Sequence, residues 1–303
     1  LDLGAHSLRM IQLARGSGQG DLRVVAAETR QLPADLPADI GPRTAALAPL
    51  LAQMHRSGGF TGRSIVAALP ATSLQYKNVR VPKMPEAEMA QAIELEAGDR
   101  MQAETGGPMR VQFFDAGEVR QGEEVRQEII MMAAPAAHVT AYLDMLVASG
   151  LHPQAIDAVP GALARWAVEA GIQTQEDLTA FVLDVGYTSS KVLVVREGRV
   201  VFFKLIDIGC QRFDQAVASR LNMPLTEAQA LRRRLGGAGA EGESNDALFG
   251  SAKRETFERA VSEAIRATAD ELMREVSLCL RYYGVTFRGK RPEKAVLTGG
   301  GAY

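Results

Sequence analysis

Two short segments of the chain carry the same chemically useful residues at the same spacing. One is LDLGAHSLRMIQL, residues 1–13, and the other is FVLDVGYTSSKVLVV, residues 181–195. In each segment an apolar run contains an acid, and a glycine, a serine and a base follow it at equal intervals. The equivalent residues are Asp2 and Asp184, Gly4 and Gly186, Ser7 and Ser189, and Arg9 and Lys191.

This combination of residues is suited to binding a phosphate. A glycine lets the backbone turn sharply and approach a ligand closely, and the N–H groups that follow it form a nest for anions. Ser7 and Ser189 add hydroxyl donors, and Arg9 and Lys191 add positive charge. Each acid would repel a phosphate, but it can hold a cation that the phosphate also binds, most often Mg2+ through water. Two such turns facing each other would hold one nucleotide from both sides.

Taken alone, each segment also fits an ordinary hairpin with a polar turn, and one short motif does not exclude that alternative. Two copies in the same register favour the nucleotide interpretation. The copies lie too far apart for a solenoid repeat, so we predict two related lobes.

A glycine run near the end of the chain is a third candidate element. Residues 295–297 are predicted to form a buried strand that runs into Gly299, Gly300 and Gly301. Glycines at a strand end let the backbone lie against a flat or charged ligand. Together with the two acidic turns, this run predicts a third side of one nucleotide site.

The elements that must position these residues have the same order in both halves. Residues 22–32 follow the first turn as a further strand, and residues 199–209 follow the second turn in the same way. Between the halves, residues 76–150 read as strand, helix, strand, strand and helix, which predicts an inserted subdomain. Apolar periodicity predicts helices at 44–57, 86–101, 136–151, 210–223, 224–236 and 252–283.

Composition excludes several classes of protein. The 303 residues are enough for two or more domains, and 47% hydrophobic with 23% charged residues is ordinary for a soluble protein. A net charge of −2 gives no general attraction to nucleic acid or to an anionic membrane. Cys210 and Cys279 are predicted to be reduced, buried thiols of a cytosolic protein.

The sequence has no long apolar run and no signal peptide, so we expect membrane association only through a partner. It begins where a strand should end and stops after the glycine run. We therefore expect further residues of the working protein beyond both ends.

The order of the motifs resembles the ATPase superfamily of actin, the heat-shock chaperones and the sugar kinases. The matching stretches are LDLGAHSLRMIQL, IDAVPGALAR, LDVGYTSSKVLVV and VLTGGGA. Four others resemble the PilM family of type IV pilus assembly proteins, relatives of the division protein FtsA. They are VPKMPEAEMAQAIELEA, YLDMLVASGLHPQAID, LTEAQALRRRLGG and LCLRYYG.

The resemblance implies an α/β, actin-like ATPase fold, in which two ribonuclease H-like lobes are duplicated and the first carries an inserted α+β subdomain. The first lobe would comprise residues 1–75 and 152–178, and the inserted subdomain residues 76–151. The second lobe would comprise residues 179–222 and 292–303, with a helical subdomain at 223–291.

The resemblance also implies roles for individual residues. Asp2 and Asp184 would hold Mg2+ through water. Phosphate contacts would come from Gly4, Ala5, His6, Ser7 and Arg9 on one side and from Gly186, Tyr187, Thr188 and Ser189 on the other. Gly299, Gly300 and Gly301 would lie against the adenosine of ATP. Asp157 would orient the attacking water, or would alternatively cap the start of a helix.

Four residues depart from the pattern of the family. Gln229 and Arg232 align with a glutamate and a lysine that touch the ribose, and the glutamine can still hydrogen bond but carries no charge. His6 and Tyr187 replace small residues of the phosphate loops. His6 is either a phosphate contact or an ordinary turn residue.

The resulting hypothesis is an ATP-binding, cytoplasmic, actin-like component of the type IV pilus machinery with at most slow ATPase activity. It would bind the cytoplasmic N-terminal tail of a PilN-like inner-membrane protein between the first lobe and the inserted subdomain. It would thus lie peripheral to the inner membrane, without binding nucleic acid, and self-association stays open. The alternatives are an FtsA-like, filament-forming division protein and a small-molecule kinase, although the first lobe offers no convincing catalytic aspartate for a kinase.

Overall fold

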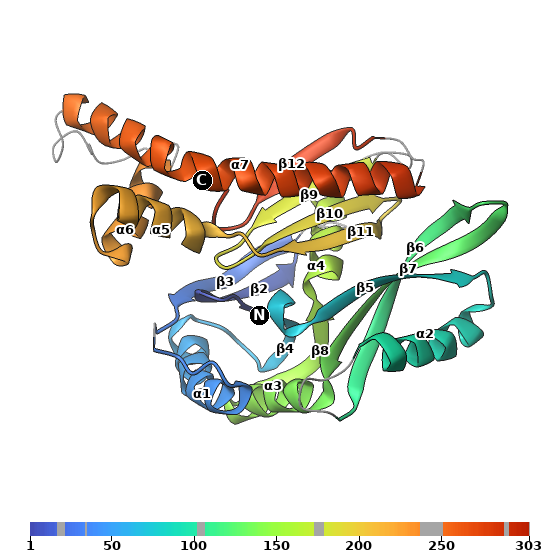
Figure 1. The fold of residues 1–303 in the computed structure, drawn as a ribbon. Coiled ribbons are helices and arrows are strands. Elements are labelled where there is room, and N and C mark those ends of the chain that lie inside the picture. The colour runs from blue at the N-terminus through green and yellow to red at the C-terminus, as the bar shows by residue number, and fades with distance from the viewer. Residues whose placement is uncertain are drawn as a thin grey trace. The chain divides into compact units, whose positions relative to one another are not determined.

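The computed structural model describes residues 1–16, 22–33, 35–101, 107–172, 179–236, 251–287 and 291–302 (Figure 1). The chain divides into two compact units. Unit 1 comprises Leu1–Gly171 and Arg196–Val201, and unit 2 comprises Ile172–Val195 and Phe202–Tyr303. The predicted division into four parts is finer than this one and stays a prediction.

Unit 1 is built on a five-stranded sheet in the order β3-β2-β1-β4-β8. β1 pairs antiparallel with β2 and parallel with β4, and β4 pairs parallel with β8. A short 3-10 turn, η1 (Ala71–Ser73), follows β4. The strands are β1 (Asp2–Leu3), β2 (Ser7–Arg15), β3 (Leu22–Gln31), β4 (Ser64–Leu69) and β8 (His152–Ala158).

Unit 2 is built on a four-stranded sheet that repeats this arrangement. Its order is β11-β10-β9-β12, which matches β3-β2-β1-β4 position by position. β12 pairs parallel with β9, as β4 does with β1. The prediction of duplicated lobes is therefore confirmed. The strands are β9 (Thr179–Val185), β10 (Ser190–Arg196), β11 (Arg199–Ile206) and β12 (Lys294–Thr298).

A second sheet in unit 1 has a core of its own. Its order is β5-β7-β6, and α2 covers one face, burying Met89, Ile93 and Ala97 against Ile129 and Met131. Met131 is fully buried in this core. The elements are β5 (Gln75–Pro82), α2 (Glu86–Arg100), β6 (Met109–Gln121) and β7 (Glu124–Pro135).

Helices α1 (Ile40–Ser57) and α3 (Ala136–Ala148) lie together beneath the five-stranded sheet (Figure 1). Leu51, Met54 and Leu146 are fully buried in one core with Leu8 of β2. The Tyr142 hydroxyl donates a hydrogen bond to the Ala68 carbonyl at 2.9 Å. α3, which we predicted as part of the inserted segment, thus packs in the core of the first sheet.

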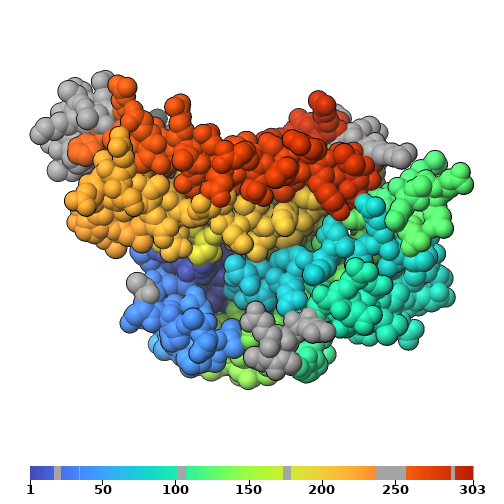
Figure 2. All heavy atoms as spheres, in the orientation of Figure 1, coloured from blue at the N-terminus to red at the C-terminus, as the bar shows by residue number. Residues whose placement is uncertain are grey.

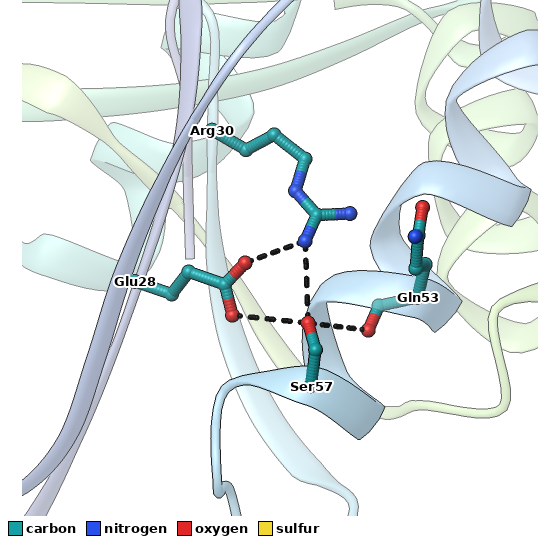
Figure 3. A network of polar contacts seen from close by, with 4 residues as sticks. All are labelled: Glu28, Arg30, Gln53 and Ser57. Carbon is teal, nitrogen blue, oxygen red and sulfur yellow. Dashed lines mark hydrogen bonds and ion pairs between the residues drawn. The ribbon is translucent and has the colours of Figure 1, made fainter.

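A polar network holds the end of α1 against β3 (Figure 3). Arg30 donates to Glu28 at 2.7 Å and to the Ser57 hydroxyl oxygen at 3.2 Å. The Ser57 hydroxyl is also 3.0 Å from the carbonyl oxygen of Gln53. This network fixes the edge strand of the sheet to the helix below it.

Unit 1 also contains α4 (Val159–Glu169), which follows β8 directly. Ala164 and Ala167 are buried, as expected for a helix of small residues that packs closely. Trp166, the single tryptophan of the chain, lies on the same helix and is 39% exposed.

The helices of unit 2 are α5 (Cys210–Leu221), α6 (Leu225–Gly236) and α7 (Ser251–Phe287). α7 runs along the sheet and forms a continuous orange to red band on the surface (Figure 2). Its residue Tyr283 is 1% exposed and contacts the ring of Phe202 on β11.

Two sequence-based expectations were wrong in detail. β12 was predicted to be buried, but among the described strands it pairs with β9 only, and Leu297 is 53% exposed. An edge strand in the described part of the sheet keeps one side open, which apolar composition does not reveal. α1 begins at Ile40, four residues before the predicted start at residue 44, because a proline is tolerated in the first turn of a helix.

Candidate functional site

The two acidic turns have the same backbone geometry. The Gly4 N–H donates to the Ser7 carbonyl at 3.0 Å, and the Gly186 N–H donates to the Ser189 carbonyl at 3.1 Å. A Cβ atom at Gly4 would lie 3.0 Å from the Ser7 carbonyl oxygen, and one at Gly186 would lie 2.7 Å from that of Ser189. A side chain at Gly186 would therefore clash with the turn, and one at Gly4 would fit only if the Ser7 carbonyl shifted slightly.

In unit 2, the turn rests on the start of α5. The backbone N–H groups of Cys210 and Gln211 donate to the carbonyls of Gly186 and Tyr187 at 2.9 and 2.8 Å. A Cβ atom at Gly209 would lie only 2.3 Å from the Tyr187 carbonyl oxygen. The first turn of a helix thus fixes the loop, and a second glycine makes this contact possible.

The glycine run lies beside the same turn. The Gly301 N–H donates to the Val185 carbonyl at 2.9 Å. Gly299 has a φ of +91°, and a Cβ atom there would lie 2.4 Å from Oδ1 of Asp184. The structure therefore brings together, in unit 2, two elements that the sequence separates by more than a hundred residues.

Each acid of the two turns forms an ion pair with the base that follows it. Arg9 lies 3.1 Å from Asp2, and their side chains are 50% and 49% exposed. Lys191 Nζ lies 2.8 Å from Oδ2 of Asp184, and these side chains are only 14% and 15% exposed. The second pair is thus enclosed by the protein, whereas the first is open to solvent.

The predicted ribose residues of α6 converge on a buried acid of α5. Asp214 is fully buried, and it accepts hydrogen bonds from Arg232 at 2.6 Å and from Gln229 at 3.3 Å. The remaining Nη2 group of Arg232 is buried and has no hydrogen-bond partner among the described residues. A buried donor without a partner costs free energy, which a bound ligand with an acceptor would recover.

Two ionisable groups beside this cluster have shifted pKa values. Burial, followed by the charge of Asp214, raises the pKa of Tyr187. Burial also raises the pKa of the Cys210 thiol. Cys210 and Cys279 are both free and buried, as predicted.

In unit 1, Asp157 lies at the end of β8, in the same row of the sheet as Asp2. Asp2 is in register with Ala68 of β4, and Ala68 is in register with Asp157. Asp157 forms an ion pair with Arg165 of α4 and accepts a hydrogen bond from the Ala158 N–H at 2.8 Å. The residue at the N-cap of α4 is Ala158, so Asp157 is not that cap.

The other predicted phosphate contacts differ in exposure. Ala5 and Thr188 are exposed, His6 and Tyr187 are half-buried, and Ser7 and Ser189 are buried. Gly300 is exposed at the end of β12. The roles of these residues, like those of the other site residues, stay predictions.

Unit 1 also contains an open cavity of about 640 Å3. Its apolar lining comes from the second sheet and α2, and α4 borders it. Charged side chains of both signs stand around it. The lining includes Lys83, Met84, Glu86, Met89, Phe113, Phe114, Asp115, Glu118, Ile129, Ala164, Arg165 and Arg199.

Sequence reasoning missed Gly209, Asp214 and this cavity. A signal for Asp214 existed, because it follows Phe213 on the apolar face of α5, where an unpaired charge would be costly. Arg232 occupies a buried position of α6 in the same way. A pair of opposite charges on two apolar helix faces indicates a buried contact between those helices.

The residues of unit 2 fit a nucleotide. Arg232 offers a buried donor without a partner among the described residues. Gly186, Gly209 and Gly299 let the loops close tightly, because a Cβ atom at any of them would meet protein atoms at less than 3.0 Å. The fit to Mg2+ is poorer, because a base already neutralises each acid. Among the described residues, no three His, Cys, Asp or Glu side chains come together as a metal site.

Comparison with known proteins identifies the family. A family model described as "Type IV pilus assembly protein PilM" matches residues 1–303, the entire sequence. This chain belongs to the PilM family. A solved PilM–PilN type IV pilus biogenesis complex is similar in fold, with a TM-score of 0.77 and 24% sequence identity over 99% of this chain and 80% of that chain.

This PilM-family chain is also similar to two other proteins, one in sequence and one in fold. FtsA, the cell division protein of Bacillus subtilis, is 27% identical over 134 residues, which is 42% of this chain and 30% of FtsA. The ethanolamine utilization protein EutJ of Carboxydothermus hydrogenoformans has a TM-score of 0.52 and 13% identity, covering 100% of this chain and 75% of that chain. The fold is actin-like, as predicted, with mixed α/β lobes.

No helix among the described residues combines the length and the hydropathy that crossing a bilayer requires.

Proposed function

We propose that this chain is an ATP-binding component of a type IV pilus machine that binds the cytoplasmic N-terminal tail of a PilN-like inner-membrane protein. The observation that carries the proposal is the match of the whole chain to the PilM family. The solved relative in complex with PilN supports the kind of partner. The chain would then work in the cytoplasm, held at the inner membrane by that partner.

The nucleotide part of the proposal rests on the turn geometry. Gly186 and Gly299 let the backbone pack closely around Asp184, where a Cβ atom would be 2.7 Å or less from protein atoms, and the turn at Gly4 has the same hydrogen bond as the turn at Gly186. Backbone N–H groups in such turns bind phosphate oxygens. Mg2+ at Asp2 and Asp184 stays a prediction, since a metal would have to replace Arg9 or Lys191 at these acids.

The cavity of unit 1 supports a site for the tail. Met84, Phe113 and Phe114 offer apolar surface, and Arg165 and Glu118 offer charge on its walls. Apolar surface with a few charged groups is typical of grooves that bind a peptide. The cavity lies between α4 and the sheet of β5, β6 and β7. The resemblance implies a tail between the first lobe and the inserted subdomain, to which these elements were assigned.

Bound ATP would favour one conformation of the chain over another. It would be hydrolysed only slowly. Asp157, the predicted residue for water activation, is held by Arg165. Its carboxylate is already occupied by the guanidinium of Arg165 and by the Ala158 N–H, so it would have to leave Arg165 to orient a water. This pairing supports at most slow hydrolysis.

The test is co-purification of the chain with the cytoplasmic tails of candidate inner-membrane proteins, with and without ATP. We expect a PilN-like tail to be retained and a tail of scrambled sequence to be lost. If no tail is retained under either condition, the pilus assignment fails. Binding of a fluorescent ATP analogue, measured on the same preparation, tests the nucleotide part separately.

The similarity to FtsA favours one alternative, a filament-forming division protein. Sedimentation with ATP would distinguish the two functions. A filament-forming protein pellets in an ATP-dependent manner, whereas a tail-binding module stays in the supernatant.

A further inference from the structure

The ion pair of Lys191 and Asp184 occupies the position that the sequence assigns to a metal. Asp184 carries the predicted Mg2+ contact of the second turn, and Lys191 Nζ lies 2.8 Å from its Oδ2 atom. A Cβ atom at Gly186 would lie 2.7 Å from the same Nζ. The ammonium group therefore lies directly over the turn where a phosphate would bind.

The surroundings hold this carboxylate on both sides. Oδ2 faces Lys191, and Oδ1 lies where a Cβ atom on Gly299 would approach to 2.4 Å. Both side chains of the pair are about one-seventh exposed. Separating an enclosed pair leaves a poorly solvated charge, so the pair resists exchange with an external cation.

The first turn offers an internal comparison. Arg9 and Asp2 have the same spacing and the same kind of pair, but their side chains are half exposed. Exposed ion pairs contribute little to stability, and dissolved salt readily screens their attraction. The ion pair of Asp184 and Lys191 is therefore harder to separate than the ion pair of Asp2 and Arg9.

We propose that Lys191 permanently holds the cation position on Asp184, so that the second turn binds the nucleotide phosphate through its own ammonium group instead of Mg2+. An ammonium group has three donors, and one of them goes to Asp184. The other two can reach phosphate oxygens, which makes Lys191 a bridge between carboxylate and phosphate. This proposal rests on the proposed binding of ATP.

The experiment measures the affinity for a fluorescent ATP analogue with Mg2+ and with a chelator. In the unsubstituted chain, Mg2+ is expected to change the affinity by less than about threefold. In Lys191→Gln, the affinity in chelator should fall by about tenfold or more, the effect expected for losing a charged hydrogen bond. Mg2+ should restore much of it, because Asp184 is then free to hold the metal.

A second measurement uses Mg2+ alone, without nucleotide. Mg2+ should raise the melting temperature of Lys191→Gln and leave that of the unsubstituted chain unchanged. Lys191→Arg keeps the charge and should behave as the unsubstituted chain does, which guards against a folding defect. Lys204→Gln, an exposed lysine of β11, is the matched control and should change neither measurement.

The outcomes separate this proposal from the proposed function. Equal Mg2+ dependence in the unsubstituted chain and in Lys191→Gln would overturn the role of Lys191 and leave ATP binding intact. ATP binding that strictly requires Mg2+ in the unsubstituted chain would do the same. No binding in either condition would overturn both.

Discussion

At the scale of single residues, the buried ion pair of Asp214 and Arg232 constrains the structure near the candidate site. Asp214 has no exposed surface, and Arg232 is 7% exposed. Removing one member of such a pair leaves an uncompensated charge inside the protein. The pair therefore fixes α6 to α5, and with it Gln229, the second predicted ribose contact.

We expect Asp214→Asn to lower the free energy of unfolding by about 3 kcal/mol or more, because Arg232 would stay buried without a counter-charge. Urea denaturation measures this change. The matched control is Glu271→Gln in α7, which removes an exposed ion pair with Arg212 of α5. It should cost far less, because exposed ion pairs contribute little to stability. Equal losses in the two variants would contradict the assignment.

The thiol of Cys210 gives a prediction on pH. Because burial raises its pKa, less thiolate is present at a given pH than for a free cysteine. Alkylation of the native chain should therefore be slow near neutral pH, and it should accelerate as the pH rises beyond the ordinary range of a thiol. In urea, labelling should be fast at neutral pH. Mass spectrometry of the labelled peptide distinguishes Cys210 from Cys279.

At the scale of elements, the turn after β9 and the loop after β12 form one structure. The Gly301 N–H donates a hydrogen bond to the Val185 carbonyl, and Gly299 lies against Asp184. Neither loop has its geometry without the other, because β12 pairs with β9 residue by residue up to Thr298 and Asp184. The conformation of the glycine run is thus set by the strand beside it.

Gly299→Ala should disturb both loops. Its φ of +91° disfavours any side chain, and the added Cβ would contact Asp184. We expect a loss of about 2 kcal/mol or more in the free energy of unfolding, together with weaker nucleotide binding. Thermal unfolding and the fluorescent ATP analogue report the two effects.

The control is Gly284→Ala in α7, where a Cβ atom would meet nothing within 4 Å. Alanine favours the helix by up to about 1 kcal/mol over glycine. That variant should therefore be unchanged or more stable. A stable Gly299→Ala chain would contradict the described geometry.

The sequence predicted most of these helices, strands and turns, but it did not predict which of them pack against one another. The turns at Gly4 and Gly186 were predictable because glycine, acid and base recur at fixed spacing. Asp214 was not, because its role depends on Arg232 of another helix, and a single sequence does not show which helices pack together. Burial of β12 was mispredicted for the same reason, since an apolar run does not tell an edge strand from a central one.

At the scale of the whole molecule, family membership and fold agree with the repeated strand order. The three-stranded sheet with α2 is the part that the other sheet does not repeat. An element present in only one half is not needed for the proposed nucleotide site, which would use the turns that both halves contain. This asymmetry supports the cavity beside it as the partner site.

Phe114→Ser should weaken binding of a PilN-like tail by about tenfold, since a large aromatic group anchors such contacts. Nucleotide affinity should not change, which isothermal titration of each ligand would establish. The control is Val125→Ser at the tip of the same sheet, which is 44% exposed and outside the cavity lining. Loss of tail binding in both variants would indicate general damage to the sheet.

α4 carries the one indole of the chain, directly after Arg165. A lone chromophore has an emission that needs no deconvolution. Trp166 is 39% exposed and does not line the cavity, although Ala164 and Arg165 of the same helix do. The emission of this one indole would therefore report changes in the packing of α4, without any attached dye.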